Sequence, residues 1–346
     1  MTSRLLPARL GRATRAASIS DESVAIVGAG AFATALASVI SARGVTAILY
    51  SEDQAIVRDI NVNRCNQSRL PGVSLARRVA ATSDLAEMAA LARVVILAVS
   101  SRSVVKVVRD LDDVLTGQHT VAHAIGALAG DDRRVSQIVR DHTRVERVVA
   151  LAGPALPGDL TARRSCAVVA ASDSEEALIE VKRALNAPPV LRLYKSPDLV
   201  GVELAAAVSG ALTVGVGLAD GLEIGHGPRT VFITRAVTEG ARLCHGSGAD
   251  PRTFFGLAGL GNLLARSSPE SRADSVDYQL GVSLARGLPP PRGETEGVRT
   301  LATACRVADL LGMSAPIVRT VHDVVSGRIS AEVAADRLAS WDTDLE

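Results

Sequence analysis

The sequence predicts an α/β fold in which helices cover both faces of a parallel sheet, followed by a second domain made only of helices. Short apolar runs alternate with helix-like stretches from residue 23 to about 198, which is typical of parallel strands joined by helical crossovers. After "SPDL" (196–199) no strand-like run follows. We therefore expect a flexible N-terminal extension, a first domain and a second domain over residues 1–22, 23–198 and 199–346.

The first domain begins with a strand, and its elements follow in regular order. The expected strands are the apolar runs at 24–30, 46–50, 93–100, 119–125, 147–153 and 166–172. Helix-like stretches separate them, among them 31–43, 101–111 and 174–185. In the second domain, the spacing of apolar residues predicts helices over 199–219, 229–246, 274–286, 296–311, 315–325 and 330–339.

The stretch "GVELAAAVSGALTVGVGLADG" (201–221) is the most apolar helix of the chain. It carries no charge between Glu203 and Asp220, and most of its side chains are small. A helix that is apolar on all sides is a buried helix, and its Gly and Ala content permits close approach of its neighbours. We expect it to be the central helix of the second domain, with Ser209 in its middle, and we expect no membrane span.

Composition excludes several classes of protein. The 346 residues are 47% hydrophobic and 22% charged, which fits a soluble globular protein with a sizeable core. A net charge of +1 and 2% aromatic residues give no basis for binding nucleic acid or an anionic membrane. The four cysteines are far apart and form no CxxC, which predicts reduced thiols in the cytoplasm and no zinc site.

Residues 1–20 contain four arginines and no acid. Two interpretations of this segment stay open. One is an organellar transit peptide, and the other is a disordered bacterial extension.

The run "VAIVGAGAFATALA" (24–37) reads as a strand, a GxGxxA turn and a helix. In such a turn Gly28 permits the tight bend, Gly30 lets a pyrophosphate approach the backbone, and Ala33 keeps the helix close to the strand. The phosphates then lie at the helix N-terminus, beside Ala31 and Phe32. The motif predicts a Rossmann-type dinucleotide-binding domain.

The strand at 46–50 is followed by Ser51, Glu52 and Asp53. An acid at this point accepts hydrogen bonds from the ribose hydroxyls of NAD and repels the additional phosphate of NADP. We therefore expect Glu52 to contact the cofactor and expect NAD, with NADP as the alternative. Either acid could instead cap the next helix.

Several stretches together resemble the NAD(P)-dependent glycerol-3-phosphate dehydrogenase family. The resemblance runs in order from about residue 23 to 325 and is carried by "GAGAFATALA", "NVNRCNQSRLPG", "LAGPALPGDL", "YKSPDLVGVEL", "GLADGLEIGHGPRTVFITRAVTEGARL", "GADPRTFFGLAGLGNL" and "ETEGVRT". It implies hydride exchange between NAD(P) and C2 of glycerol 3-phosphate, in a site between the two domains. It also implies a homodimer formed through the helical domain.

The family's charged catalytic side chains are replaced in this sequence. The central helix of the family carries a Lys-Asn pair whose lysine transfers the proton, and here those positions are Ser209 and Gly210. A second lysine, in a Thr-Lys-Gly strand end, is replaced by Ile125. The aspartate of a Gly-Leu-Gly-Asp motif becomes Asn262.

Other positions of the family motifs survive. Of an Arg-Asn pair that contacts substrate, Arg272 is kept and Ala273 follows it. The resemblance implies substrate contacts for Arg272, Gly153 and Ser271, and a cofactor contact for Glu296.

The replacements leave the proton donor of the reaction open. A positioned acid typically contributes 10²–10⁴-fold to such a reaction, and none of the three lysines of the chain stands at one of the replaced positions. The remaining candidates for catalysis are Ser209, Asn262 and His123. His123 ends a strand two residues before Ile125, and it points either toward the cofactor or into the layer of helices, because strand side chains alternate.

Three functions therefore stay open. The first is an NAD(P)-dependent oxidoreductase acting on a hydroxyl, ketone or imine carbon of an altered, small anionic substrate. The second is an inactive dinucleotide-binding protein with a sensing or scaffolding role. The third is a glycerol-3-phosphate dehydrogenase with a diverged site.

Overall fold

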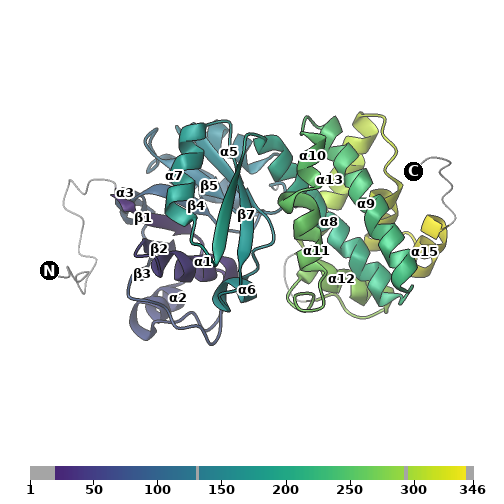
Figure 1. Ribbon diagram of the computed structural model, residues 1–346, viewed down its shortest axis with the longest axis horizontal. Coiled ribbons are helices and arrows are strands. Elements are labelled where there is room, and N and C mark those ends of the chain that lie inside the picture. The colour runs from purple at the N-terminus through teal and green to yellow at the C-terminus, as the bar shows by residue number, and fades with distance from the viewer. Residues whose placement is uncertain (1–19, 130–131, 292–294, 340–346) are drawn as a thin grey trace.

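The computed structural model has two lobes, one built around a sheet and one made of helices (Figure 1). It describes residues 20–129, 132–291 and 295–339. The α/β fold class expected from the sequence is confirmed. Most of the expected N-terminal extension, residues 1–19, lies outside the described residues.

The first lobe holds an eight-stranded sheet with the order β3-β2-β1-β4-β5-β6-β7-β8. All neighbouring strands are parallel except β6 and β7. The expectation of a wholly parallel sheet is therefore wrong at this pair, and two strands, β3 and β8, are additional to the expected set. The strands are β1 (Ser20–Val27), β2 (Thr46–Tyr50), β3 (Val79–Thr82), β4 (Ala92–Leu97), β5 (Thr120–His123), β6 (Arg147–Ala152), β7 (Cys166–Ala171) and β8 (Leu191–Ser196).

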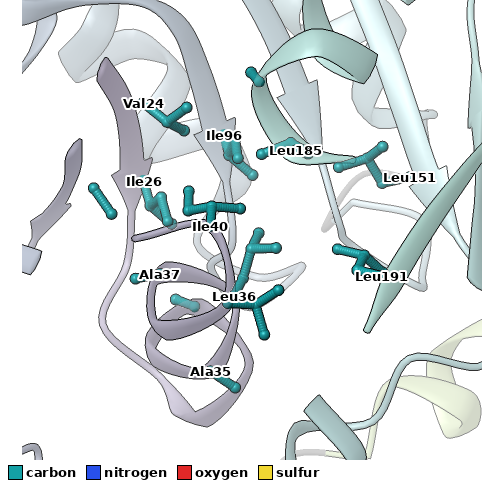
Figure 2. Close-up of a cluster of buried hydrophobic side chains, with 14 of the residues drawn as sticks. Val24, Ile26, Ala35, Leu36, Ala37, Ile40, Ile96, Leu151, Leu185 and Leu191 are labelled. Atoms are coloured by element: carbon teal, nitrogen blue, oxygen red, sulfur yellow. The ribbon is translucent and has the colours of Figure 1, made fainter. Parts of the chain in front are cut away.

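Helices cover both faces of this sheet, and each face has its own apolar core. One face packs against α1 (Ala31–Ser41), α6 (Pro157–Thr161) and α7 (Glu175–Leu185), and Figure 2 shows Leu36 and Ile40 of α1 beside Ile26 and Ile96. The other face packs against α3 (Leu85–Leu91), α4 (Val104–Asp112) and α5 (Val135–His142). The short helices α2 (Gln54–Arg58) and η1 (Asp59–Asn63) follow β2.

The second lobe surrounds α8 (Leu199–Gly221), which begins directly after its N-cap residue Asp198. The Asp198 carboxylate accepts a hydrogen bond from the Gly201 N–H at 2.8 Å, so this side chain satisfies one of the free donors of the first turn. The other helices of this lobe are α9 (His226–Gly246), α10 (Pro251–Phe254), η2 (Leu257–Gly261), α11 (Asn262–Arg266), α12 (Val276–Ala285), α13 (Glu296–Leu310), α14 (Pro316–Val325) and α15 (Ala331–Ala339).

Helix α8 is the central helix of this lobe, as its composition predicts. Of the helices in the described part of the chain, it alone is long and apolar enough to cross a bilayer, but 89% of its most apolar window is buried inside the protein. Glycines bring α8 and α12 into backbone contact, since a Cβ at Gly217 or Gly281 would overlap the backbone of the other helix. Helix α8 is therefore a core helix, and its small residues set the helix spacing.

Candidate functional site

The glycine turn after β1 has the geometry of a phosphate-binding loop. Gly28 has φ +114°, and a Cβ there would lie 2.5 Å from the carbonyl oxygen of Ala98, so only glycine fits. A Cβ at Gly30 would meet nothing within 4 Å, and no side chain caps the N-terminus of α1. Open space beside an uncapped helix N-terminus fits the pyrophosphate of a dinucleotide.

A buried asparagine that the sequence analysis did not single out holds this loop. The Asn66 side-chain amide donates hydrogen bonds to the carbonyl oxygen of Ala29 and to Oγ1 of Thr34, both at 2.9 Å. Asn66 is 1% exposed. Asn66 belongs to the stretch "NVNRCNQSRLPG". The resemblance of that stretch to the family is the feature of the sequence that could have pointed to Asn66.

The two acids after β2 have different environments. Asp53 caps α2 and accepts a hydrogen bond from the Ala55 N–H at 2.8 Å. Glu52 is exposed, and its carboxylate lies 3.0 Å from Nζ of Lys106. Hydrogen bonds to Asp110 and Glu52 raise the pKa of Lys106. Glu52 therefore carries a paired charge at the end of β2.

A cavity of about 210 Å³ lies between the two lobes. Phe32 of the glycine turn and Gly153 at the end of β6 line it from the first lobe, and Asn262 and Arg266 of α11 line it from the second. At Gly153 φ is +143°, and a Cβ there would lie 2.9 Å from the carbonyl oxygen of Ala167. The cavity therefore joins the dinucleotide loop to polar side chains of the helical lobe.

The structure brings two of the predicted catalytic residues into contact. The Asn262 side-chain amide donates a hydrogen bond to Oγ of Ser209 at 2.9 Å. The Ser209 hydroxyl in turn donates to the carbonyl oxygen of Ala206 at 2.8 Å, and Ser209 is fully buried. Because its hydrogen is already bonded and it does not line the cavity, Ser209 orients the amide of Asn262.

Arg266 is a second residue that the sequence analysis did not single out. Its Nη1 lies 3.6 Å from Oδ2 of Asp277. A Cβ built at Gly126 would lie 3.2 Å from Nη2, and one built at Gly210 would lie 3.7 Å from Nη1. The guanidinium therefore fills the space between these two glycines. The available signal was its position four residues after Asn262, on the same face of a helix.

Asp277 pairs with the Arg266 guanidinium, and the charge of Glu296 acts on Asp277. Asp277 is buried and accepts a hydrogen bond from the Gly297 N–H at 3.0 Å. Burial, aided by the charge of Glu296, raises the pKa of Asp277 to about 6, although Arg266 and the Gly297 N–H act in the opposite direction. Glu296 accepts a hydrogen bond from the Ser101 N–H at 3.0 Å and so ties the helical lobe to the first lobe.

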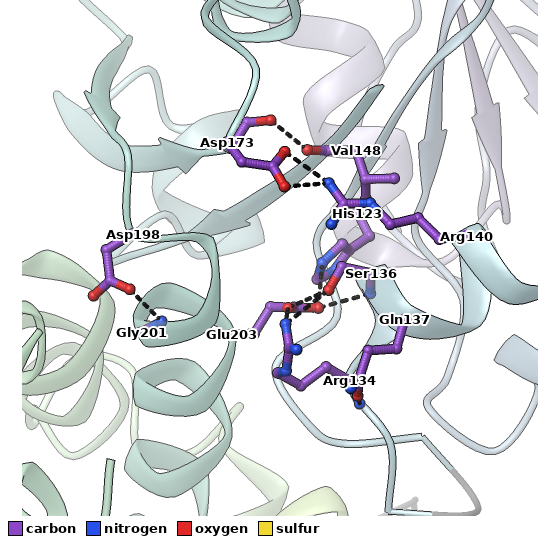
Figure 3. A network of polar contacts seen from close by, with 11 residues as sticks. His123, Arg134, Ser136, Gln137, Arg140, Val148, Asp173, Asp198, Gly201 and Glu203 are labelled. Atoms are coloured by element: carbon purple, nitrogen blue, oxygen red, sulfur yellow. Dashed lines mark hydrogen bonds and ion pairs between the residues drawn. The ribbon is translucent and has the colours of Figure 1, made fainter. Parts of the chain in front are cut away.

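His123 points into the layer of helices. Its Nε2 lies 3.1 Å from Oε1 of Glu203, which also accepts hydrogen bonds from the N–H and hydroxyl of Ser136 and from Arg134 (Figure 3). Burial raises the pKa of Glu203, but the contacts with His123 and Ser136 outweigh it, and the net pKa is lowered. His123 does not line the cavity. It contacts Glu203 of α8 and so belongs to the contact between the two lobes.

The structure separates Arg272 from Asn262. Arg272 lines a second cavity, of about 590 Å³, with His226 and Arg229, and this cavity shares no lining residue with the first. Its Nη1 donates to the Tyr278 hydroxyl at 3.4 Å.

Neither Ser271 nor Ile125 lines the first cavity, although Ala124 and Gly126, on either side of Ile125, do. The hydroxyl of Ser271 is 2.8 Å from that of Ser268, within its own loop. Ile125 packs in the core beneath α4 and α5. Among the described residues, no lysine lines the cavity between the lobes.

The chain combines a dinucleotide-binding lobe with a helical lobe, and its phosphate loop opens on a cavity that the two lobes share. This combination is typical of the class of nicotinamide-nucleotide-dependent dehydrogenases. Comparison with known proteins identifies the family. Residues 23–178 match the model of the NAD-dependent glycerol-3-phosphate dehydrogenase N-terminus, and residues 198–336 match the model of its C-terminus. The chain belongs to this family.

Individual relatives agree with this assignment. The chain is 33% identical to a glycerol-3-phosphate dehydrogenase [NAD(P)+] of Geobacter metallireducens, over 94% of this chain and 99% of that protein. It is 34% identical to the protein of the same name in Streptomyces coelicolor, over 91% and 96%. The crystal structure of glycerol-3-phosphate dehydrogenase from Coxiella burnetii superposes with a TM-score of 0.86 at 25% identity, over 92% of this chain and 99% of that one.

Proposed function

We propose that the chain is an NAD(P)-dependent oxidoreductase that exchanges hydride with a small anionic carbonyl or hydroxyl compound in the cavity between the lobes. One observation carries this proposal: Phe32 of the dinucleotide loop lines the same cavity as Asn262 and Arg266. A substrate there would contact both the cofactor-binding loop and a cationic side chain. When bound, the nicotinamide supplies or accepts the hydride.

The residues of the chain have separate tasks in this proposal. Gly28, Gly30 and the N-terminus of α1 hold the pyrophosphate, and Asn66 keeps the loop in place. Arg266 binds the anionic group of the substrate with its planar, forked donors. Asn262 offers its second amide hydrogen to the reacting oxygen, because the first is bonded to Ser209.

In this proposal the protein binds NAD with a slightly higher affinity than NADP. The Glu52 carboxylate repels a 2′-phosphate, but the Lys106 ammonium 3.0 Å away offsets part of that repulsion. Fluorescence titration with NADH and NADPH measures the ratio of the two affinities. Replacement of Lys106 by Met removes the offsetting charge and should widen the preference for NADH; an unchanged ratio of affinities would place the ribose elsewhere.

Turnover tests the reaction itself. The names of the relatives make dihydroxyacetone phosphate the first substrate to assay, followed by a panel of other anionic ketones, with loss of NADH absorbance as the readout. Arg266→Gln should raise KM about 10- to 100-fold, since hydrogen bonds to charged groups contribute about 1.5–3 kcal/mol. Arg252→Gln, at a side chain that is 89% exposed, is the matched control. A larger loss in Arg272→Gln than in Arg266→Gln would move the site to the second cavity.

The alternative of an inactive dinucleotide-binding protein is favoured by one observation. The Ser209 hydroxyl is committed to a backbone carbonyl, and the described residues place no lysine in the cavity. This alternative expects tight NADH binding without oxidation by any member of the panel.

We also propose a cytoplasmic location, a domain boundary at residue 198 and a homodimer formed through the helical lobe. The four free cysteines support the first, and the end of β8 at Ser196 with the start of α8 at Leu199 supports the second. The exposed Val231 on α9 and Leu310 at the end of α13 support the third. Light scattering on the purified protein measures the oligomeric state.

A further inference from the structure

The walls of the cavity between the lobes are almost entirely apolar. Of its 18 lining residues, only Asn262 and Arg266 carry polar side chains. Both come from α11, so the polar groups lie on one side. The rest of the lining is apolar, and Leu36, Leu185 and Leu191 of α1, α7 and β8, all at most 2% exposed, close it off as a leucine end.

This leucine end extends into the core of the first lobe. Figure 2 shows Leu36 of α1 facing Leu151 and Leu191, which come from β6 and β8. A ligand in the cavity therefore has its charged group at α11 and its remaining atoms against apolar side chains, with the leucine end as the floor.

The charge of the cavity fits one carboxylate better than a phosphate. Arg266 is the sole cation among the lining residues, and Asp277 offsets part of its charge at 3.6 Å. A phosphate dianion would be left with few donors, whereas a carboxylate is matched by one guanidinium. Hydroxyl groups placed among the leucines would lose their hydrogen bonds to water without replacement.

The cavity volume of about 210 Å³ suits a small molecule. Arg266 holds the carboxylate and Asn262 contacts the reacting oxygen, and the two residues lie one turn apart on α11. The carboxylate of the ligand is therefore adjacent to the reacting carbon.

From this arrangement we infer that the substrate is a 2-oxo acid or 2-hydroxy acid with an apolar side chain; this inference rests on the proposed oxidoreductase function. In the direction of reduction, the C2 carbonyl carbon gains a hydride from the reduced nicotinamide nucleotide. The carbonyl oxygen gains a proton from water, and the products are the 2-hydroxy acid, the oxidised nucleotide and hydroxide. Arg266 holds the carboxylate, and the leucine end holds the side chain.

The test is a chain-length series with the wild-type protein and NADH, from 2-oxopropanoate to 2-oxohexanoate, with dihydroxyacetone phosphate alongside. We expect kcat/KM to rise about fourfold with each methylene, which corresponds to about 0.8 kcal/mol per buried CH₂, until the leucine end is full. A flat series, or a higher kcat/KM for dihydroxyacetone phosphate, would overturn this inference and leave the proposed oxidoreductase function intact. Failure to reduce any of these compounds would overturn both.

Variants locate the side-chain end of the substrate. Leu191→Ala lengthens the cavity and should move the optimum of the series to a longer acid. Leu178→Ala is the matched control, because Leu178 is 3% exposed in the same apolar core but does not line the cavity. NADH affinity reports whether each variant is folded. If Leu191→Ala binds NADH but keeps the wild-type optimum, the side chain does not lie among these leucines.

Discussion

Replacement of Glu203 by Ala should destabilise the protein strongly, because this carboxylate joins the two lobes. Glu203 is 5% exposed and accepts hydrogen bonds from the Ser136 N–H at 2.8 Å, the Ser136 hydroxyl at 2.6 Å and Arg134 at 3.1 Å, with His123 at 3.1 Å. Removal of one partner from a buried charged pair typically costs about 3–5 kcal/mol. We expect a loss of this size in the free energy of unfolding, measured by urea denaturation and circular dichroism.

A matched exposed pair separates burial from charge. Glu176 is 65% exposed and lies 3.0 Å from Arg147, so Glu176→Ala should cost less than about 1 kcal/mol. The pH dependence has a definite sign: the pKa of Glu203 is lowered in the folded protein, so its contribution is present above pH 4.5 and is lost as the pH falls below that value. A Glu203→Ala protein within about 1 kcal/mol of wild type at neutral pH would refute this account of the lobe contact.

Two further predictions concern the cofactor loop and the anion site. Gly28→Ala should destabilise the fold, whereas Gly30→Ala should fold normally but weaken NADH binding, because only the first meets backbone atoms; equal thermal stability of the two variants would contradict this. Anion affinity should rise several-fold as the pH falls through about 6, because Asp277, which Arg266 and Glu296 face, becomes neutral and leaves the guanidinium uncompensated. Calorimetric titration from pH 5 to 8 measures it, and Asp277→Asn should remove the dependence.

The sequence predicted the sheet lobe, the helical lobe and the phosphate loop because those signals are local. Periodicity carries no information on strand direction, so the antiparallel pairing of β6 and β7 could not be foreseen. Strand β3 has only four residues, so its apolar run is too short to stand out, and β8 alternates buried and exposed side chains at the edge of the sheet instead of forming an apolar run.

The cation of the candidate site was missed for a different reason. Arg266 is one of 38 basic residues, all but three of them arginines, so its type gave no signal. Its role depends on the glycines at 126 and 210, which lie on two other segments of the chain and leave space for the guanidinium. Such a long-range fit is set by tertiary packing, and a motif aligned along the chain cannot show it.

The guanidinium between Gly126 and Gly210 also limits how this chain can change over evolution. An asparagine restored at position 210 would extend into Arg266 and Asp277, whose nearest atoms lie 3.7 Å from the position of its first side-chain carbon. Loss of Arg266 on its own would leave Asp277 as a buried acid without its counter-charge. The asparagine of the family's Lys-Asn pair is therefore opposed at position 210 by Arg266, and Arg266 is in turn held in place by the charge of Asp277.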